Sequence, residues 1–433
     1  MAREYKDSGI EWIGQIPKEW EVRRIKSIFT ERTELSENGD ETLLSVSEYY
    51  GVANRKDKIE DGEFVSRAES LVGYKKCYEG DLVSNIMLAW KGSLGVTDID
   101  GIVSPAYCVY KPSKEIFPHY YHYLFRTSLF TSIFRLFSKG IIDSRLRLYS
   151  PYFYAISTLF PPLLEQQKIA DYLDKVCSEV DELVSLQEKM IEELKAYKQS
   201  IITEAVTKGL NPNVPMRNSG IDWIGEIPEH YKQSKTLYVL SMSITDGPHT
   251  TPNLYDDGIP FISADAVSDG YINFDNKRGY VSESFYEECC KKYIPQRDDI
   301  YMIKSGASTG RTAIVETDEI FTIWSPLAVF RANKSIMEPR FLLYVLRSEG
   351  YQKQVEINWS FGTQQNIGMR TLESLIVCYP SLSEQQQIAS FLDTKCSEID
   401  SLIALKQQKI EELKDYKKSV IYEYVTGKKE VGG

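Results

Sequence analysis

The chain has little of what metal-dependent, disulfide-stabilised or membrane-bound proteins need. Its 433 residues include only four histidines, which are too scattered for a histidine-based metal site. The seven cysteines are odd in number and form no CxxC pair, which favours reduced thiols over disulfides. Apolar runs are short, and the first residues lack the apolar core of a signal peptide. We therefore expect a cytoplasmic protein without a membrane span.

An excess of positive charge is also missing. The net charge is −11, and none of the segments 1–160, 161–210, 211–378 and 379–433 is basic overall. This balance argues against a uniformly basic nucleic-acid binder. Any binding to DNA would therefore depend on local clusters of side chains. The length of 433 residues predicts two or three domains.

The sequence does contain an internal repeat. The segment SGIEWIGQIP at 8–17 recurs as SGIDWIGEIP at 219–228, with 8 of 10 residues identical. Residues 165–207 match residues 384–426 at 25 of 43 positions without a gap. The intervening globular segments share a skeleton but few side chains. The chain is therefore a duplication in which a constant frame carries two divergent heads.

The two repeated stretches predict long helices over 165–208 and 384–426, because no Pro or Gly interrupts the first before Gly209. At 1.5 Å per residue, such a helix spans roughly 65 Å. Its apolar residues follow steps of four and three, which indicates a helix paired with another helix. These positions in the first helix are Ile169, Leu173, Val176, Val180, Leu183, Met190, Leu194, Tyr197 and Ile201. The residues expected to pair the helices are Leu173, Val180, Leu183, Gln187, Leu194, Leu392, Ile399, Leu402, Lys406 and Leu413.

The repeat also predicts how the chain closes on itself. The SGIDWIG segment follows the first helix in the chain, whereas its N-terminal copy has no helix before it. If the halves are related by a pseudo-twofold axis, the second helix returns to that N-terminal copy. The helices would then be antiparallel, in a circular arrangement in which Gln187 faces Lys406.

The heads predict mixed α+β domains. Alternating apolar residues at 107–110 and 327–330 indicate strands, and aromatic-rich helices are expected to begin near Pro118 and Pro339. The predicted organisation is a first head at 1–160, a helix at 161–210, a second head at 211–378 and a second helix at 379–433.

None of the strings that resemble catalytic motifs meets the requirements of the motif. GASTGRT at 306–312 is one residue short of a P-loop, has Arg where Lys is required, and precedes a predicted strand. The E-x-K spacings at 193–195 and 412–414 lie within the predicted helices, and SPYF at 150–153 is interpreted as a turn. There is no Ser/His/Asp or Cys/His arrangement, so we expect no catalytic centre and no metal or cofactor bound by this chain.

Residues suited to DNA contact occur in loops of both heads. Arg matches the acceptors of guanine, and Gln or Asn those of adenine, in the major groove. Short loops with Ser, Thr and Lys can also bind phosphates, although any one of them could be an ordinary solvated loop. The candidate DNA-binding residues are Tyr49, Tyr50, Trp90, Lys91, Lys139, Arg145, Arg147, His249, Thr250, Lys304, Thr309, Arg311, Gln364, Gln365 and Asn366.

Several strings together resemble the specificity subunit of type I restriction–modification systems, over the whole chain. They are the SGIEWIG and SGIDWIG segments, LLSVS at 43–47 followed by YYGV at 49–52, DGPH at 246–249, GTQQ at 362–365, and the EQQ helix starts after Pro162 and Pro380. The first head lacks the DGPH and GTQQ strings, so its candidate contacts depend on residue chemistry alone.

The resemblance implies two target recognition domains that each read half of a split DNA sequence, with helices that set the gap. It implies double-stranded DNA, two modification subunits and two restriction subunits as partners. S-adenosylmethionine, ATP and magnesium are then expected on those partners. Half-sites read from one face of DNA would lie about one turn, roughly 34 Å, apart. The alternatives are a coiled-coil scaffold whose heads bind proteins, and an enzyme that acts alone.

Overall fold

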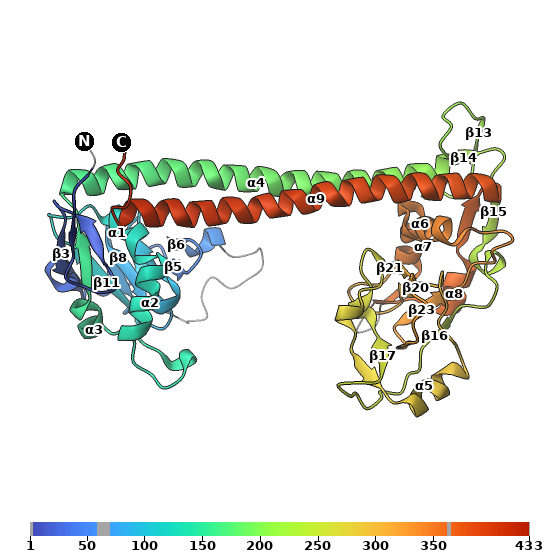
Figure 1. Cartoon of the computed structure of the whole chain (residues 1–433), viewed down its shortest axis with the longest axis horizontal. Coiled ribbons are helices and arrows are strands. Elements are labelled where there is room, and N and C mark those ends of the chain that lie inside the picture. The colour runs from blue at the N-terminus through green and yellow to red at the C-terminus, as the bar shows by residue number, and fades with distance from the viewer. Residues whose placement is uncertain (1–2, 59–69, 362–364, 433) are drawn as a thin grey trace. The chain divides into compact units, whose positions relative to one another are not determined.

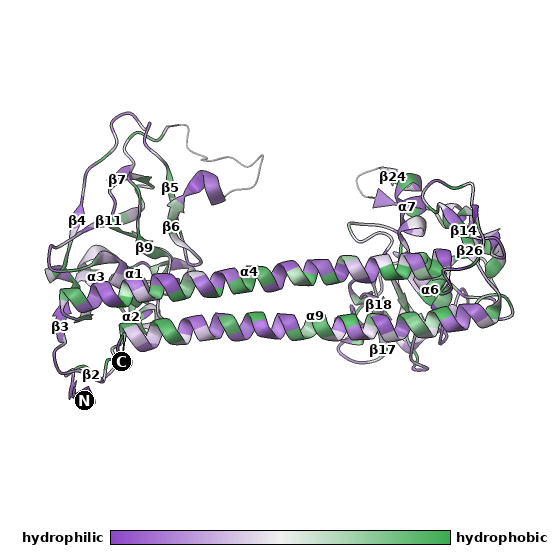
Figure 2. Ribbon diagram, turned by 90° about the horizontal axis from the view of Figure 1, so that it is seen from above, coloured by the Kyte–Doolittle hydropathy of each residue, from purple (hydrophilic) through white to green (hydrophobic). Residues whose placement is uncertain are grey.

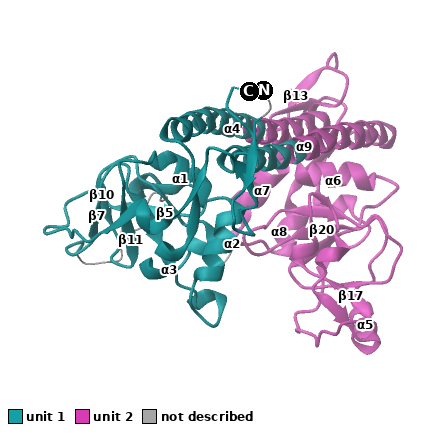
Figure 3. Ribbon diagram, turned by 60° about the vertical axis from the view of Figure 1, so that its left-hand side comes forward, with its two compact units in different colours: residues 1–187, 408–433 teal, residues 188–407 magenta. Residues whose placement is uncertain are grey.

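The computed structural model describes residues 3–58, 70–361 and 365–432, and it divides into two compact units (Figure 3). Unit 1 comprises residues 1–187 and 408–433, and unit 2 comprises residues 188–407. Each unit contains one globular head and part of both long helices. Among the described residues, no helix is both long and apolar enough to cross a membrane.

The head of unit 1 is built around a four-stranded antiparallel sheet of order β4-β11-β8-β9 (Figure 1). The strands of this unit are β1 (Tyr5–Asp7), β2 (Gln15–Pro17), β3 (Glu21–Arg24), β4 (Phe29–Arg32), β5 (Leu44–Ser47), β6 (Gly51–Asn54), β7 (Lys75–Cys77), β8 (Leu82–Asn85), β9 (Leu94–Val96), β10 (Gly101–Val103), β11 (Tyr107–Pro112) and β12 (Ser157–Phe160). Its short helices are α1 (Pro118–Phe125), α2 (Ser128–Phe137) and α3 (Ser150–Ala155). Buried aromatic rings such as Phe125 and Phe130 pack these helices against the sheet.

The head of unit 2 contains a five-stranded mixed sheet of order β16-β23-β20-β21-β18, in which β18 and β21 run parallel. The strands are β13 (Met216–Asn218), β14 (Glu226–Pro228), β15 (Lys232–Lys235), β16 (Thr245–Asp246), β17 (Ile259–Ile262), β18 (Gly270–Tyr271), β19 (Gly279–Val281), β20 (Ile300–Ile303), β21 (Thr312–Ile314), β22 (Thr322–Ile323), β23 (Leu327–Phe330), β24 (Ser360–Phe361), β25 (Gln365–Asn366) and β26 (Ile376–Tyr379). The short helices are α5 (Glu283–Cys290), α6 (Pro339–Arg347), α7 (Glu349–Asn358) and α8 (Met369–Ser374).

These elements confirm the predicted α+β class with two heads and two long helices. The predicted strands at 107–110 and 327–330 are β11 and β23, and helices do begin at Pro118 and Pro339. The loop at 306–311 leads into β21 rather than a helix, as the rejection of a P-loop requires. The interpretation of SPYF as a turn was wrong. Ser150 and Pro151 open α3, because Pro is tolerated in the first turn, where its missing N–H has no partner to lose.

The long helices are α4 (Leu163–Lys208) and α9 (Leu382–Val425), each a continuous run with alternating apolar and polar faces (Figure 2). Within unit 1, the Tyr172 ring lies 4.6 Å from that of Tyr424, and Lys417 Nζ lies 2.7 Å from the Asp181 carboxylate. The two helices are therefore antiparallel in this unit. The same antiparallel pairing holds within unit 2, where Lys198 Nζ lies 2.8 Å from Asp400. Lys198 and Asp400 are the repeat counterparts of Lys417 and Asp181.

Burial along the two helices follows a heptad spacing, but one of the two contact residues in each heptad differs from the predicted one. Leu173, Val180, Leu392 and Ile399 are buried as expected, whereas Leu183 and Leu402 are 47% and 48% exposed. Along the middle of α4, the buried and half-buried residues that recur at steps of four and three are Leu173, Cys177, Val180, Val184, Gln187, Ile191, Leu194 and Lys198. Those along α9 are their counterparts Leu392, Cys396, Ile399, Ile403, Lys406, Ile410, Leu413 and Lys417. Each second seam residue is thus one position later than predicted.

The shift has a simple cause. At most of these places two neighbouring residues are both apolar, as Leu183 and Val184 are, and periodicity alone cannot choose between them. In the seam itself, Lys406 Nζ lies 3.4 Å from Met190 Sδ within unit 2. The pairing of Gln187 with Lys406 stays a prediction.

The EQQ strings join each long helix to its head. The fully buried Gln166 accepts a hydrogen bond from the Phe117 N–H at 2.8 Å and donates to the Pro161 carbonyl. In unit 2, Gln385 makes the corresponding bonds to the Glu338 N–H and the Pro380 carbonyl. A buried amide is costly unless it is fully paired, so each glutamine holds the start of a long helix against the start of the head's helical layer.

The N-terminal segment and the end of α9 meet in unit 1, as the circular arrangement predicts. Trp20 donates its indole N–H to Glu165, and the Tyr5 hydroxyl donates to the Gly427 carbonyl at 3.1 Å. A Cβ at Gly427 would lie 2.6 Å from Pro17 Cδ, so a larger residue does not fit there. In unit 2 the equivalent junction is covalent, because α4 runs through Gly209 into the β13–β14 hairpin.

Candidate nucleic-acid interface

In unit 1, three groups of the head assemble around Trp90. The Lys91 ammonium lies 5.3 Å from the centroid of its indole ring, and the Arg135 guanidinium lies 5.0 Å from the same centroid. Arg135 sits in the last turn of α2 and also pairs with Asp143 at 2.8 Å. The loop after β8 and the end of α2 are thereby joined to the segment that follows α2.

That segment is a hairpin, Lys139 to Arg147, which we call the α2–α3 hairpin. Lys139 and Arg147 exchange backbone hydrogen bonds of 2.9 Å in both directions. The Lys139 ammonium lies 4.9 Å from the centroid of the Tyr152 ring, and the Arg147 guanidinium donates to the Ser144 and Leu146 carbonyls. The Arg145 side chain is exposed, and its guanidinium forms no hydrogen bond or ion pair with any other described residue. Its guanidinium is therefore available to a ligand.

The tyrosines at 49 and 50 lie beside the long helices. Tyr49 is 85% exposed, and both tyrosines line a groove of about 1030 Å³ with residues of α4 and α9, among them Lys414 and Lys418. Arg126 holds this turn by donating to the Glu48 and Tyr49 carbonyls at 3.0 Å. The fold of unit 1 thus brings together Trp90, Lys91 and the α2–α3 hairpin, and it places the two tyrosines beside the long helices.

In unit 2, the corresponding group forms around the loop after β20. The Ile367 N–H donates to the Lys304 carbonyl at 2.9 Å, and the Gly306 N–H donates to the Gln365 carbonyl at 3.0 Å. The β24–β25 hairpin therefore lies beside the Lys304 loop. Asn366 and Arg311 are exposed, and the Thr309 hydroxyl donates to the Gly306 carbonyl. Gln364 lies outside the described residues.

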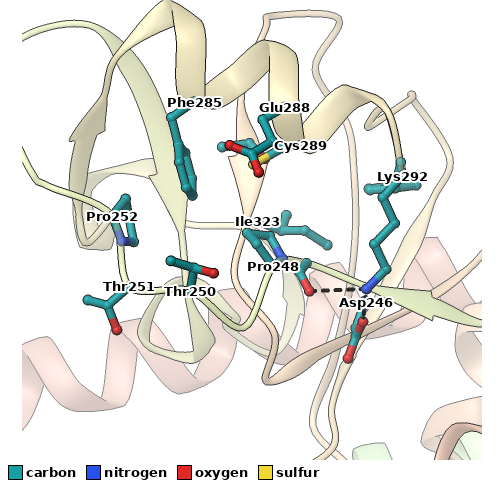
Figure 4. Close-up of a pocket in the computed structure, with 13 residues that line it drawn as sticks. Asp246, Pro248, Thr250, Thr251, Pro252, Phe285, Glu288, Cys289, Lys292 and Ile323 are labelled. Atoms are coloured by element: carbon teal, nitrogen blue, oxygen red, sulfur yellow. Dashed lines mark hydrogen bonds and ion pairs between the residues drawn. The ribbon is translucent and has the colours of Figure 1, made fainter.

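A buried carboxylate connects this loop to the DGPH segment (Figure 4). Asp246 is 1% exposed and contacts Lys292, which extends from beyond the end of α5. Lys304 Nζ lies 3.1 Å and His249 Nε2 3.4 Å from the same carboxylate. Thr250, exposed in the same segment, lines with Asp246 and Lys292 a cavity of about 370 Å³.

The electrostatics of Asp246 follow from these contacts. Burial alone would raise the pKa of its carboxyl, but the ammonium groups of Lys292 and Lys304 outweigh burial and hold the pKa below its usual value. The ionised carboxylate in turn fixes two lysines and a histidine at one edge of the sheet. The cluster has a positive charge in excess of its single negative charge, which suits an anionic ligand.

The sequence reasoning missed Arg135, Lys292 and Asp246. Arg135 could have been found as the basic residue at the end of an aromatic helix that leads into a basic segment. Lys292 carries no such signal, because only the fold brings it from 46 residues away to Asp246. No group of side chains with metal-ligating character occurs among the described residues.

Comparisons with known proteins identify the family of this chain. The sequence pattern described as the type I restriction modification DNA specificity domain matches residues 17–196 and 248–415. The chain belongs to this family. It is a specificity subunit of a type I restriction–modification system, with two domains for DNA sequence recognition.

Three relatives illustrate the likeness. The putative type I restriction enzyme MjaX specificity subunit of Methanocaldococcus jannaschii is 25% identical over 433 residues, which cover 96% of this chain and 95% of the relative. A solved chain from a study of complex assembly and conformational transition in a type I system has a TM-score of 0.71 at 19% identity, with coverage of 95% and 98%. The HsdS subunit of Thermoanaerobacter tengcongensis has a TM-score of 0.53 at 18% identity, with the same coverage. At these identities, the two structures establish the fold.

The charge on Asp246 predicts a pH-dependent contribution to stability in this specificity subunit. Because its pKa is lower in the folded state, the carboxylate stabilises the fold fully above the unfolded pKa of about 4, and the contribution is lost as pH falls below that value. Asp246→Asn should weaken local stability around β16 at pH 7 by about 1.5–3 kcal/mol, the range for hydrogen bonds to charged groups. Hydrogen exchange of the β16 and β23 amides between pH 3 and 7 measures this.

The matched control is Asp256→Asn, which removes the same charge from an exposed loop residue of the same head. It should leave the β16 and β23 amides unchanged. If Asp246→Asn lowers local stability by the same amount at pH 3 and pH 7, packing, and not charge, stabilises the site.

Proposed function

We propose that each head of this specificity subunit reads one half of an asymmetric, bipartite DNA target, and that the chain itself carries out no catalysis. The observation that supports this is the convergence, in each head, of a loop and a hairpin that carry basic, amide or aromatic side chains. In unit 1 these are the Trp90 loop and the α2–α3 hairpin; in unit 2 they are the Lys304 loop and the β24–β25 hairpin. The two groups differ in side chains, so they would read different sequences.

The chemistry of the exposed groups suits base readout in the major groove. An arginine such as Arg145 can donate two hydrogen bonds to guanine, and Gln365 or Asn366 can pair in the same way with adenine. Lys91, Lys304 and Thr309 would contact phosphates, which position the protein without reading sequence. Sequence-specific contacts of this kind need no net positive charge over the whole chain.

The helices offer a docking site in each unit. Leu183 and Leu186 follow Asp181 on α4 and are about half exposed, and Tyr416 precedes the ion-pair partner Lys417 on α9 at 53% exposure. The same three residue types recur in unit 2. Their counterparts there are Leu402, Leu405 and Tyr197, exposed by 48%, 62% and 58%. Two equivalent apolar sites would bind two copies of one partner.

We assign these sites to two modification subunits of the type I complex, with two restriction subunits completing the assembly. S-adenosylmethionine, ATP and magnesium would then be used by those partners. The seven free cysteines are consistent with a cytoplasmic location, where the DNA is. Membership of the specificity family argues against the alternative of a solitary coiled-coil scaffold.

The first test separates the half-sites. Arg145→Ala should relax recognition in the half-site read by head 1 alone, and Gln365→Ala in the other, each by about 5- to 150-fold, as lost bidentate contacts cost about 1–3 kcal/mol. Binding of the assembled methyltransferase to targets varied one base pair at a time measures this. Lys195→Ala, an exposed helix residue, is the control. Equal weakening on all sequences would identify phosphate contacts instead.

A second test addresses the helices as the spacer. Insertion of seven residues after both Gln187 and Lys406 keeps the heptad phase and lengthens each helix by about 10 Å. The permitted gap between half-sites should then grow by roughly three base pairs, at about 3.4 Å each. Mapping of methylated adenines across targets of graded spacing gives the answer, and an unchanged gap would contradict the spacer function.

A third test counts the partners. Leu186→Asp should remove one modification subunit and Leu405→Asp the other, because a charge in an apolar contact costs several kcal/mol if it remains unpaired. Native mass spectrometry reports the number of subunits bound. Lys195→Asp, nine residues on and therefore on the opposite flank of α4, should retain both. Retention of both subunits by the Leu186→Asp and Leu405→Asp variants would exclude these sites.

A further inference from the structure

The α2–α3 hairpin of unit 1 has an apolar tip, and contacts with the rest of the head hold the hairpin. Ile141 is 98% exposed, and the next residue, Ile142, is 54% exposed. Next to them, Gly140 packs closely against the opposite side of the hairpin, where a Cβ would lie 2.6 Å from the Arg145 carbonyl oxygen. Only glycine fits that position without displacing the opposite side of the hairpin.

Contacts on each side hold the tip in place. Asp143 accepts from Arg135 with both carboxylate oxygens, at 2.8 and 2.9 Å. At the base, Leu148 is buried and its N–H donates to the Ile86 carbonyl at 2.9 Å. The hairpin is therefore attached at both of its ends to the α2 and β8 region. A preorganised tip loses little conformational entropy when it binds a ligand.

The position of this tip distinguishes it from an ordinary exposed apolar residue, which by itself needs no explanation. In unit 2, the segment between α7 and α8 carries the β24–β25 hairpin, with Gln365 and Asn366. In unit 1, the equivalent segment between α2 and α3 carries Ile141, with exposed Lys139 and Arg145 close to it in the chain. The place that holds amides in one head holds an apolar side chain between basic groups in the other.

We propose that Ile141 reads thymine by packing against its methyl group in the major groove, with Lys139 and Arg145 holding the hairpin there. This groove admits a two-stranded ribbon, and the thymine methyl is the apolar group that base edges present in it. The inference rests on the proposed function of head 1 and adds one specificity-determining residue to it.

The experiment removes the methyl group alone. In the mapped target, each thymine of the half-site read by head 1 is replaced in turn by deoxyuridine, which keeps every hydrogen bond. At one position or two adjacent ones, the assembled methyltransferase should bind about fourfold more weakly, the factor for losing one buried methyl-sized group. The Ile141→Ala variant should bind the thymine and uracil targets equally.

Controls separate this inference from the proposed function. Ile141→Ala should leave deoxyuridine effects in the other half-site unchanged, and Leu136→Ala, which alters a 75% exposed residue of α2, should keep the thymine preference. Equal binding of both targets by the unaltered chain, or a thymine preference that survives Ile141→Ala, would overturn the inference. Absence of any sequence-specific binding would instead refute the proposed function.

Discussion

The pairing of α4 with α9 is the contact on which the rest of the structure depends. Each unit takes its helical layer from both α4 and α9, so neither head has a complete core until the two helices pair. The seam includes a buried lysine in unit 2, Lys198, which is costly unless it is paired. Burial lowers its pKa, but Asp269 and Asp400 outweigh that and raise it, so the lysine stays charged. Because Asp269 belongs to the head, the same lysine ties the head of unit 2 to its helices.

Inside each head, a buried carboxylate organises the sheet from which the loops project. Asp81 is paired with Arg32 in unit 1, and Asp299 with Arg331 in unit 2, each with the carboxylate about 1% exposed. Exposed ion pairs contribute little, but loss of one partner from a buried pair is expensive. Asp246 differs from these two because it has several cationic partners. It therefore holds positive groups at an edge that the proposed DNA contact uses.

A constant frame with two divergent heads is a physical solution to reading an asymmetric sequence. The frame repeats to the level of single contacts, since Gln166 and Gln385, and Lys417 and Lys198, occupy equivalent places. The heads share the order of the three short helices that precede each long helix, but they differ in their sheets and in the side chains on the loops. Loops that add little to the core can vary without loss of stability, so readout can change while the frame and its partner sites stay the same.

The sequence by itself determined the duplication, the long helices, the α+β class and the closure of the chain, because each follows from periodicity and repetition along the chain. Only the tertiary structure decided which of two adjacent apolar residues enters the seam, as with Leu183 and Val184, since both satisfy the heptad spacing. It also decided that Trp90 joins the α2–α3 hairpin while Tyr49 faces the helices, and that Lys292 reaches Asp246. These contacts join residues distant in the chain, and no local pattern records them.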